Sequence, residues 1–303
     1  MRLAVAQLRR LPPNVQGALW LVSGGFIFTC NGVMIRLLSD QIESVQTAFF
    51  RAIFSVIMLL PLMMSGRVQP WKSTRLHGHF WRTLMGTTSM VLGFYAVSML
   101  PLADATALGF SQPLFSVCVA ALVLREKVRW RRWSATIVGF IGVLVVIRPG
   151  FGGGMKWAAL ISVASALFYA GLGIMTRFVS RTDTSDTTLF YANLTGVMVM
   201  IPVLPFVWTA MPTGFDLLLL VAVGMCGSGG HYFLIAAHRR APASVLSPFM
   251  YTQLVWATTL GFLVFGDVPT EWTLLGAVIV VASAAFMVAF VHARPYTLSG
   301  HDV

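Results

Sequence analysis

The stretch 101–125 reads PLADATALGFSQPLFSVCVAALVLR, and the stretch 242–267 reads PASVLSPFMYTQLVWATTLGFLVFGD. Each is an apolar run of about the 20 residues that an α-helix needs to cross a bilayer. Moving the chain along itself by 141 residues, the distance from Pro101 to Pro242, also lays Gln112 on Gln253. A segment of membrane length that recurs at one fixed shift predicts a membrane protein with an internal repeat.

The composition of the 303-residue chain agrees with this interpretation. Hydrophobic residues make up 57% of the chain and charged residues only 10%, whereas soluble globular proteins carry about 25% charged residues. Apolar runs lie at 16–37, 45–64, 79–99, 104–124, 133–148, 156–178, 187–208, 215–237, 242–265 and 272–292. The predicted fold class is therefore an all-α integral membrane protein with ten transmembrane helices.

The basic residues orient these helices. An even number of helices places both termini on one side of the membrane, and 17 of the 21 Lys and Arg residues then fall on that side. The four exceptions are Arg36, Arg148 and Lys156 on the other side and Arg51 within the second run. Because basic loops stay in the cytoplasm, the N- and C-termini are predicted to be cytoplasmic. This explains the net charge of +11, and no nucleic acid is expected as a partner.

The shift of 141 residues also matches charged residues in the two halves. Arg36 falls on Arg177, and the acid Glu126 falls on Asp267. The predicted domains are a first repeat at 1–149, a linker at 150–154 and a second repeat at 155–303. Because five helices separate equivalent positions, and five is odd, the two repeats are expected to cross the membrane in opposite directions. Inverted repeats are typical of secondary transporters, although a duplication kept only for packing is the alternative.

The stretches 101–149 and 242–267 resemble the paired ends of EamA-type domains of the drug/metabolite transporter superfamily. In that family the fourth and ninth helices end at an acid, as they do at Glu126 and Asp267 here. The resemblance covers the whole chain as two such domains. It implies a secondary transporter that works by alternating access in the bacterial inner membrane.

Members of this superfamily carry amino acids, nucleotide sugars, riboflavin, S-adenosylmethionine or metallophores. The second half of the chain looks closest to the bacterial branch that takes up riboflavin and S-adenosylmethionine. One departure is Leu254, which stands at the position equivalent to Pro113. Because proline interrupts a helix and leucine does not, the two halves are expected to bend differently.

Polar and aromatic side chains inside the predicted helices are the candidate substrate contacts, because such residues are costly in lipid and usually face a cavity or one another. The small-residue run at 227–230 leads into His231, an arrangement suited to exposing backbone groups to a ligand. The alternative is structural, since polar side chains also join neighbouring helices. The candidate substrate-binding residues are Asn31, Arg51, Tyr95, Gln112, Tyr169, His231, Tyr251, Gln253 and Trp256.

The ten acidic residues all lie in predicted loops, tails or helix ends. A cationic solute such as S-adenosylmethionine then has no carboxylate partner at mid-depth, whereas Arg51 and His231 favour a neutral or anionic solute. Aromatic side chains such as Tyr169 and Trp256 suit a planar ring. We therefore expect transport of a riboflavin-like or other aromatic metabolite, with an exporter of amino acids as the alternative.

Other classes of protein fit the sequence less well. A membrane enzyme needs a cluster of acids or bases at the membrane surface, and the acids here are few and dispersed, so no catalytic residue is predicted. Cys30, Cys118 and Cys226 occur singly, so no metal site or cofactor is expected. The expected partners are the lipid bilayer and a small-molecule substrate, and the oligomeric state stays open, with a homodimer as one alternative.

Overall fold

The structure, a computed structural model, describes residues 11–64, 76–123, 130–147, 155–179, 185–209, 211–241, 246 and 249–292. These residues form helices joined by short turns, and none of them lies in a β-strand. The predicted linker at 150–154 and the acid Glu126 lie outside the described residues.

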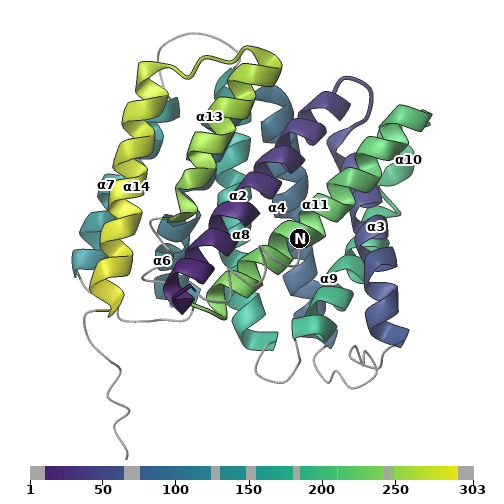
Figure 1. The fold of residues 1–303 in the computed structure, drawn as a ribbon, viewed down its shortest axis with the longest axis horizontal. Coiled ribbons are helices and arrows are strands. Elements are labelled where there is room, and N and C mark those ends of the chain that lie inside the picture. The colour runs from purple at the N-terminus through teal and green to yellow at the C-terminus, as the bar shows by residue number, and fades with distance from the viewer. Residues whose placement is uncertain are drawn as a thin grey trace, which may run out of the picture.

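Each of the ten predicted apolar runs contains a described helix (Figure 1). The helices are α2 (Pro13–Leu38), α3 (Ser44–Met64), α4 (Leu76–Met99), α5 (Leu102–Gly109), α6 (Gln112–Val123), α7 (Trp130–Ile147), α8 (Met155–Val179), α9 (Ser185–Met200), α10 (Leu204–Val207), α11 (Gly214–His238), α13 (Thr252–Phe265) and α14 (Glu271–His292). Among the described residues, four segments are both long and apolar enough to cross a membrane, namely Pro13–Leu38, Leu102–Val119, Trp157–Thr176 and Gly214–His238.

Two of the predicted runs are each divided between two described helices. The run 104–124 is divided between α5 and α6, with a turn between them. This corrects the prediction of one continuous helix over 104–124. Pro113 explains the division, because in a continuous helix its ring would clash with the carbonyl of Gly109, four residues earlier. The run 187–208 is divided between α9 and α10, and Pro202 lies at that division.

The second repeat is interrupted at the position equivalent to the first interruption. Tyr251 lies in a turn before α13, as Phe110 lies in the turn after α5, and the two residues are 141 positions apart. The backbone N–H of Leu254 donates to the carbonyl oxygen of Tyr251 at 3.0 Å. The two halves were expected to bend differently because Leu254 replaces the proline. They are nevertheless interrupted at equivalent positions.

Small residues bring α7 and α14 together at one edge of the bundle (Figure 1). A Cβ added to Gly142 of α7 would lie 3.0 Å from the carbonyl oxygen of Gly276 in α14. The shift of 141 residues converts this pair into Ser283 and Ala135, and the Ser283 hydroxyl donates to the carbonyl oxygen of Ala135. The contact is thus made twice with the two helices exchanged, as a twofold axis between them produces.

The contacts of α2 with α11 and of α4 with α8 follow the same relation. A Cβ added to Gly24 of α2 would lie 3.6 Å from the carbonyl oxygen of Gly230 in α11. The equivalent residues are Ser165 of α8 and Ser89 of α4, and each hydroxyl donates to the other residue's carbonyl oxygen, at 2.7 and 2.9 Å. Glycine and serine are both small enough for the close approach of helices that membrane proteins use.

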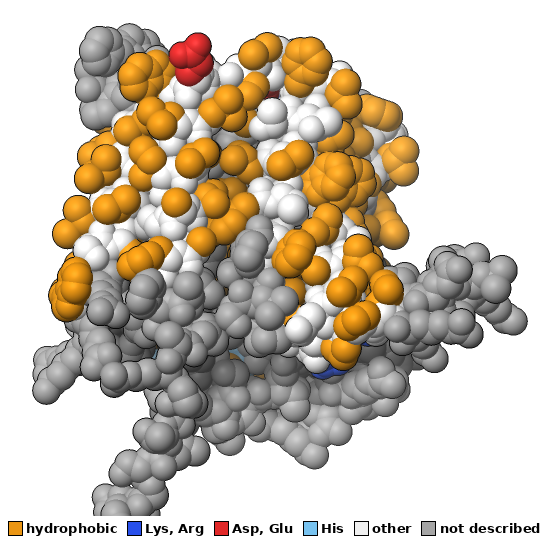
Figure 2. All heavy atoms as spheres, turned by 60° about the vertical axis from the view of Figure 1, so that its left-hand side comes forward, with side chains coloured by type: hydrophobic (Ala, Val, Ile, Leu, Met, Phe, Trp, Pro, Cys, Tyr) orange, Lys and Arg blue, Asp and Glu red, His pale blue; other side chains and the backbone are white. Residues whose placement is uncertain are grey.

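The described surface is largely apolar. Figure 2 shows hydrophobic side chains spread over the face to which α7 and α14 contribute. Exposed aliphatic side chains on these two helices include Ile137, Val138, Ile141, Leu144, Leu274, Leu275 and Val278. Trp130, Trp157 and Trp272 are also exposed and lie in the first turns of α7, α8 and α14. An apolar band with tryptophans near the helix ends is typical of a protein surrounded by lipid.

Candidate functional site

The guanidinium group of Arg51 lies inside the bundle among α3, α4 and α11. It covers Gly227 of α11 so closely that a Cβ there would lie 2.5 Å from Nε. Its Nη1 donates to Sδ of Met90 in α4, and Cζ lies 5.8 Å from the ring centroid of Phe94. The buried Nε has no hydrogen-bond partner among the described residues. A thioether sulfur is only a weak acceptor, so most of the hydrogen-bonding capacity of Arg51 is unused.

Arg82 is a second arginine of this interior, and sequence reasoning missed it. The basic residues that the sequence assigns to the cytoplasmic side include Arg82, but the structure places Arg82 in the second turn of α4, where Nε donates to Oγ1 of Thr176 in α8 at 3.0 Å. The hydroxyl of Tyr169 in α8 is within electrostatic range of both Arg82 and Arg51. The signal that could have identified Arg82 is its position, because it falls inside the predicted run 79–99.

His231 completes the group on the side of α11. Its ring packs edge-to-face on Phe28 of α2, with 5.2 Å between centroids, and it is within electrostatic range of Arg51 and Arg82. Tyr169 keeps 37% of its surface exposed. We call Arg51, Arg82, Tyr169 and His231 the arginine cluster. Three of these four residues were predicted from the sequence, and they come from the four helices α3, α4, α8 and α11.

A second group lies where the two interrupted helices meet. The rings of Phe110 and Tyr251, which are equivalent in the repeat, pack edge-to-face with 5.3 Å between centroids. A residue that touches its own equivalent lies close to the axis that relates the halves. Gln112 and Gln253 follow these turns, and a Cβ added to Gly25 of α2 would lie 3.5 Å from Cβ of Gln253. Both glutamines are half-buried and neither amide bonds to another described residue.

The remaining predicted residues have other surroundings. Asn31 is buried, and its Nδ2 donates to the carbonyl oxygen of Val223 at 2.8 Å, which joins α2 to α11. The ring of Trp256 packs edge-on against Phe26 with 5.3 Å between centroids, and its buried Nε1 has no partner among the described residues. Tyr95 is half-buried on α4, and no described ring contact joins it to the other candidates.

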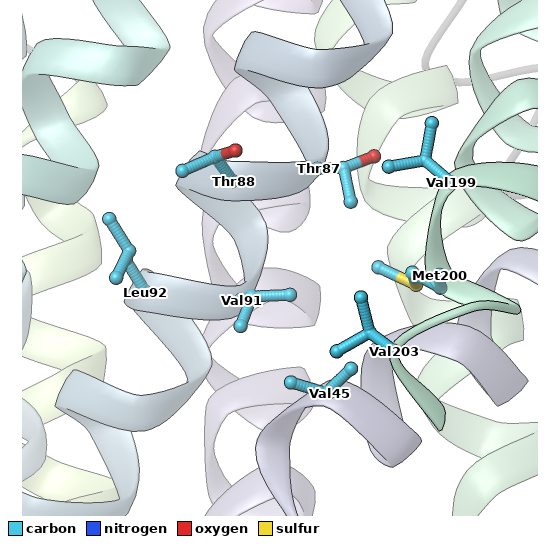
Figure 3. Close-up of a pocket in the computed structure, with 8 residues that line it drawn as sticks. All are labelled: Val45, Thr87, Thr88, Val91, Leu92, Val199, Met200 and Val203. Atoms are coloured by element: carbon cyan, nitrogen blue, oxygen red, sulfur yellow. The ribbon is translucent and has the colours of Figure 1, made fainter. Parts of the chain in front are cut away.

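A pocket of about 220 Å³ lies between α3, α4 and α9 (Figure 3). Its lining residues are Val45, Thr87, Thr88, Val91, Leu92, Val199, Met200 and Val203. The side chain of Thr87 points toward Val199 across the pocket. Only the two threonine hydroxyls are polar, so the pocket suits an apolar group. No member of the candidate set and no residue of the arginine cluster lines it.

The acids whose side chains are described all lie at helix ends. Asp104 and Asp216 are buried in the first turns of α5 and α11, and Asp267 forms an ion pair with Arg36 where α13 and α2 end. The described part of the chain contains no group of three His, Cys, Asp or Glu residues that could hold a metal ion. The chemistry available inside the bundle is therefore that of cations, amides and aromatic rings.

A family model described as the EamA-like transporter family matches residues 15–148 and again residues 156–289. The chain belongs to this family. It is thus a transporter of the EamA family, with one family match in each half of the sequence repeat.

This EamA transporter resembles curated transporters over nearly its whole length. It is 31% identical over 278 residues to the S-adenosylmethionine uptake transporter of Rickettsia felis, which covers 92% of this chain and 94% of that protein. It is 30% identical over 282 residues to the riboflavin transporter of Vibrio cholerae, with 90% of this chain and 93% of that protein covered. Because relatives named for two substrates are about equally similar, identity alone does not select the substrate.

Two further comparisons are more distant. The human solute carrier family 35 member G1 is 27% identical over 294 residues, with 91% of this chain and 79% of that protein covered. A crystal structure superposes with a TM-score of 0.62 at 17% identity and covers 93% of this chain and 100% of that chain. At this identity the superposition supports the fold alone.

Proposed function

We propose that this EamA transporter carries a small neutral or anionic aromatic metabolite, riboflavin-like in shape, across the bacterial inner membrane by alternating access. The observation that carries this proposal is the convergence of the arginine cluster from four helices. Tyr169 is a neutral phenol, and the ion pair among the described residues joins Arg36 to Asp267, so no described carboxylate pairs with Arg51 or Arg82. Guanidinium groups and aromatic rings attract an electron-rich planar solute and disfavour a cation.

Ten membrane crossings in two inverted repeats are part of the proposal. The contact of Gly142 with Gly276, repeated by Ser283 and Ala135, supports a twofold relation between the halves. The acids whose side chains are described lie at helix ends, and the proposed orientation puts these ends on the side opposite the termini. These acids are Asp40, Glu43, Asp104, Asp216, Asp267 and Glu271.

The proposed substrate class differs from the solute for which one relative is named. The Rickettsia felis protein is named for uptake of S-adenosylmethionine, whose sulfonium group is positively charged. Placing that charge beside Arg51 and Arg82 costs free energy unless a carboxylate is near, and the described interior offers none. The name of the Vibrio cholerae relative, a riboflavin transporter, fits the arginine cluster better.

Flux into proteoliposomes tests this function. Purified protein is reconstituted, and uptake of riboflavin and of S-adenosylmethionine is measured separately against protein-free vesicles. We expect saturable riboflavin flux and no S-adenosylmethionine flux above the control. The Arg51→Gln variant should lose most of the flux, while Arg240→Gln, an exposed arginine 5.0 Å from the Trp20 ring, should keep it. S-adenosylmethionine flux without riboflavin flux would contradict the substrate class.

A further inference from the structure

The two arginines of the arginine cluster carry more hydrogen-bonding capacity than the described residues use. Arg51 donates to Met90, and its buried Nε has no partner among the described residues, while Arg82 donates to Thr176. Each guanidinium has five N–H donors in a planar fork. Within the described residues the ion pair of the structure joins Arg36 to Asp267 and involves neither of them. A charge held away from water is stable only when it is paired and hydrogen-bonded.

Packing of the fold does not require these charges. The shift of 141 residues places Ala192 opposite Arg51 and Val223 opposite Arg82. Val223 is fully buried in an apolar cluster with Leu220, so an uncharged side chain fills that position of the fold in the other half. The charges of Arg51 and Arg82 therefore have no counterpart at the equivalent positions of the other half. Binding of a ligand explains them better than helix packing does.

The cluster is open to a ligand at Tyr169. This side chain lies near the middle of α8 (Met155–Val179), where contact with neighbouring helices would normally bury it. It nevertheless remains 37% exposed and lies within electrostatic range of both guanidinium groups. A planar ring placed against Tyr169 would therefore lie in the positive potential of Arg51 and Arg82.

We propose that Arg51 and Arg82 bind a phosphate or carboxylate group of the transported solute while Tyr169 packs against its ring. This inference rests on the proposed function and narrows its substrate class from neutral or anionic metabolites to anionic ones. Guanidinium groups suit this role because their planar fork matches the oxygens of both anions. Arg82 becomes a substrate-binding residue, and the two arginines act together rather than Arg51 alone.

Riboflavin and riboflavin 5′-phosphate form a matched pair of probes, because they share the ring and differ by one phosphate. Binding of each probe to the purified full chain is measured by flavin fluorescence in nanodiscs of phosphatidylcholine. We expect the phosphate ester to bind about tenfold more tightly than riboflavin, as a charge-assisted hydrogen bond allows. Arg51→Gln and Arg82→Gln should each remove this preference, because the phosphate ester loses more affinity than riboflavin does when a guanidinium group is removed. Equal binding of both probes to the wild-type chain would overturn the inference.

Two controls separate binding from folding. Arg82→Lys keeps the positive charge and should keep a weakened preference for the phosphate ester, whereas Arg240→Gln should keep the full preference. If Arg82→Gln folds, as judged by monodisperse elution, and retains the full preference, Arg82 does not bind the anion and the inference fails. Riboflavin carries no phosphate, so its flux tests the proposed function separately. If riboflavin is transported but the chain shows no binding preference for riboflavin 5′-phosphate, this inference fails and the proposed function stands.

An anionic lipid headgroup offers the same chemistry as a solute phosphate. The binding measurement is therefore repeated in nanodiscs that contain phosphatidylglycerol. If the solute is the ligand, the preference for the phosphate ester survives at the same arginines. If phosphatidylglycerol abolishes the preference in the wild-type chain, the arginines bind lipid, and the assignment to the transported solute is wrong.

Discussion

At the scale of single residues, Gly227 decides where the guanidinium group of Arg51 can lie. A side chain at this position of α11 would occupy the space that Nε, Nη2 and Cζ of Arg51 now fill. Gly229, two residues further along the same helix, has open space around its Cα. The two glycines therefore separate an effect on the arginine cluster from a general effect on the helix.

Gly227→Ala should weaken solute binding without unfolding the protein. The new Cβ would lie 2.5 Å from Nε of Arg51, and the flexible arginine side chain rather than the backbone must move. Loss of one charge-assisted hydrogen bond predicts a fall in affinity of roughly three- to tenfold. Riboflavin 5′-phosphate binding and thermal unfolding are measured together, with Gly229→Ala as the control. Unchanged affinity in Gly227→Ala would show that the position of Arg51 does not matter.

The sequence predicted part of the candidate site for a clear physical reason. Arg51, Tyr169 and His231 are polar or amphipathic residues deep inside apolar runs, and the cost of burying them marks them without any structure. Arg82 was missed because it lies near the start of its helix, where a side chain can turn either to the cytoplasm or to the interior. Asn31, predicted as a substrate contact, donates a hydrogen bond that joins two helices, and its role in binding stays a prediction.

At the scale of helices, length and apolar composition were sufficient to locate the runs, and the interruptions were not predicted. The division of the run 104–124 follows from Pro113, whose position in the middle of an apolar run was visible in the sequence. The matching interruption at Tyr251 has no proline at the position equivalent to Pro113, since Leu254 stands there. Which turn a helix adopts there depends on contacts with its neighbours, and hydrophobic patterns do not encode these contacts.

Gly276→Ala should destabilise the contact between α7 and α14. The added Cβ would lie 2.7 Å from the carbonyl oxygen of Gly142 and 2.5 Å from Cγ2 of Val146, so the two helices must separate. Overpacking of this kind costs about 1–3 kcal/mol, and the thermal unfolding midpoint in detergent should fall by several degrees. Gly173→Ala in α8, where nothing lies within 4 Å, is the matched control. Equal midpoints for the two variants would contradict the close packing.

At the scale of the whole molecule, we expect the basic residues to orient the chain in the membrane and the repeat to relate its two halves. The sequence alone predicted the family, the two-part organisation and the accumulation of basic residues on one side. The structure adds that the acids whose side chains are described lie at helix ends, which the predicted orientation puts on the other side. Exposed loops at the two ends of α11 allow a direct test of this orientation, because this single helix of 25 residues is long enough to cross the membrane.

Cysteine labelling should place the two ends of α11 on opposite sides of the membrane. In a background in which the three native cysteines are replaced by serine, Met211→Cys should react with a membrane-impermeant maleimide in intact spheroplasts. Met211 precedes α11 and is 79% exposed. Arg239→Cys, at the exposed C-terminal end of α11, should react only after the membrane is opened. Reaction of both from the same side would contradict the orientation.

Counterflow tests the central claim, that this chain is a carrier with one solute site exposed alternately to the two sides. Proteoliposomes are loaded with unlabelled riboflavin 5′-phosphate, and the labelled compound is added outside while ionophores collapse the proton and sodium gradients. Because no described acid lies at mid-depth to couple an ion, labelled compound should accumulate transiently above its external concentration without any gradient. Simple equilibration, at the same rate in loaded and empty vesicles, would contradict alternating access through a single site.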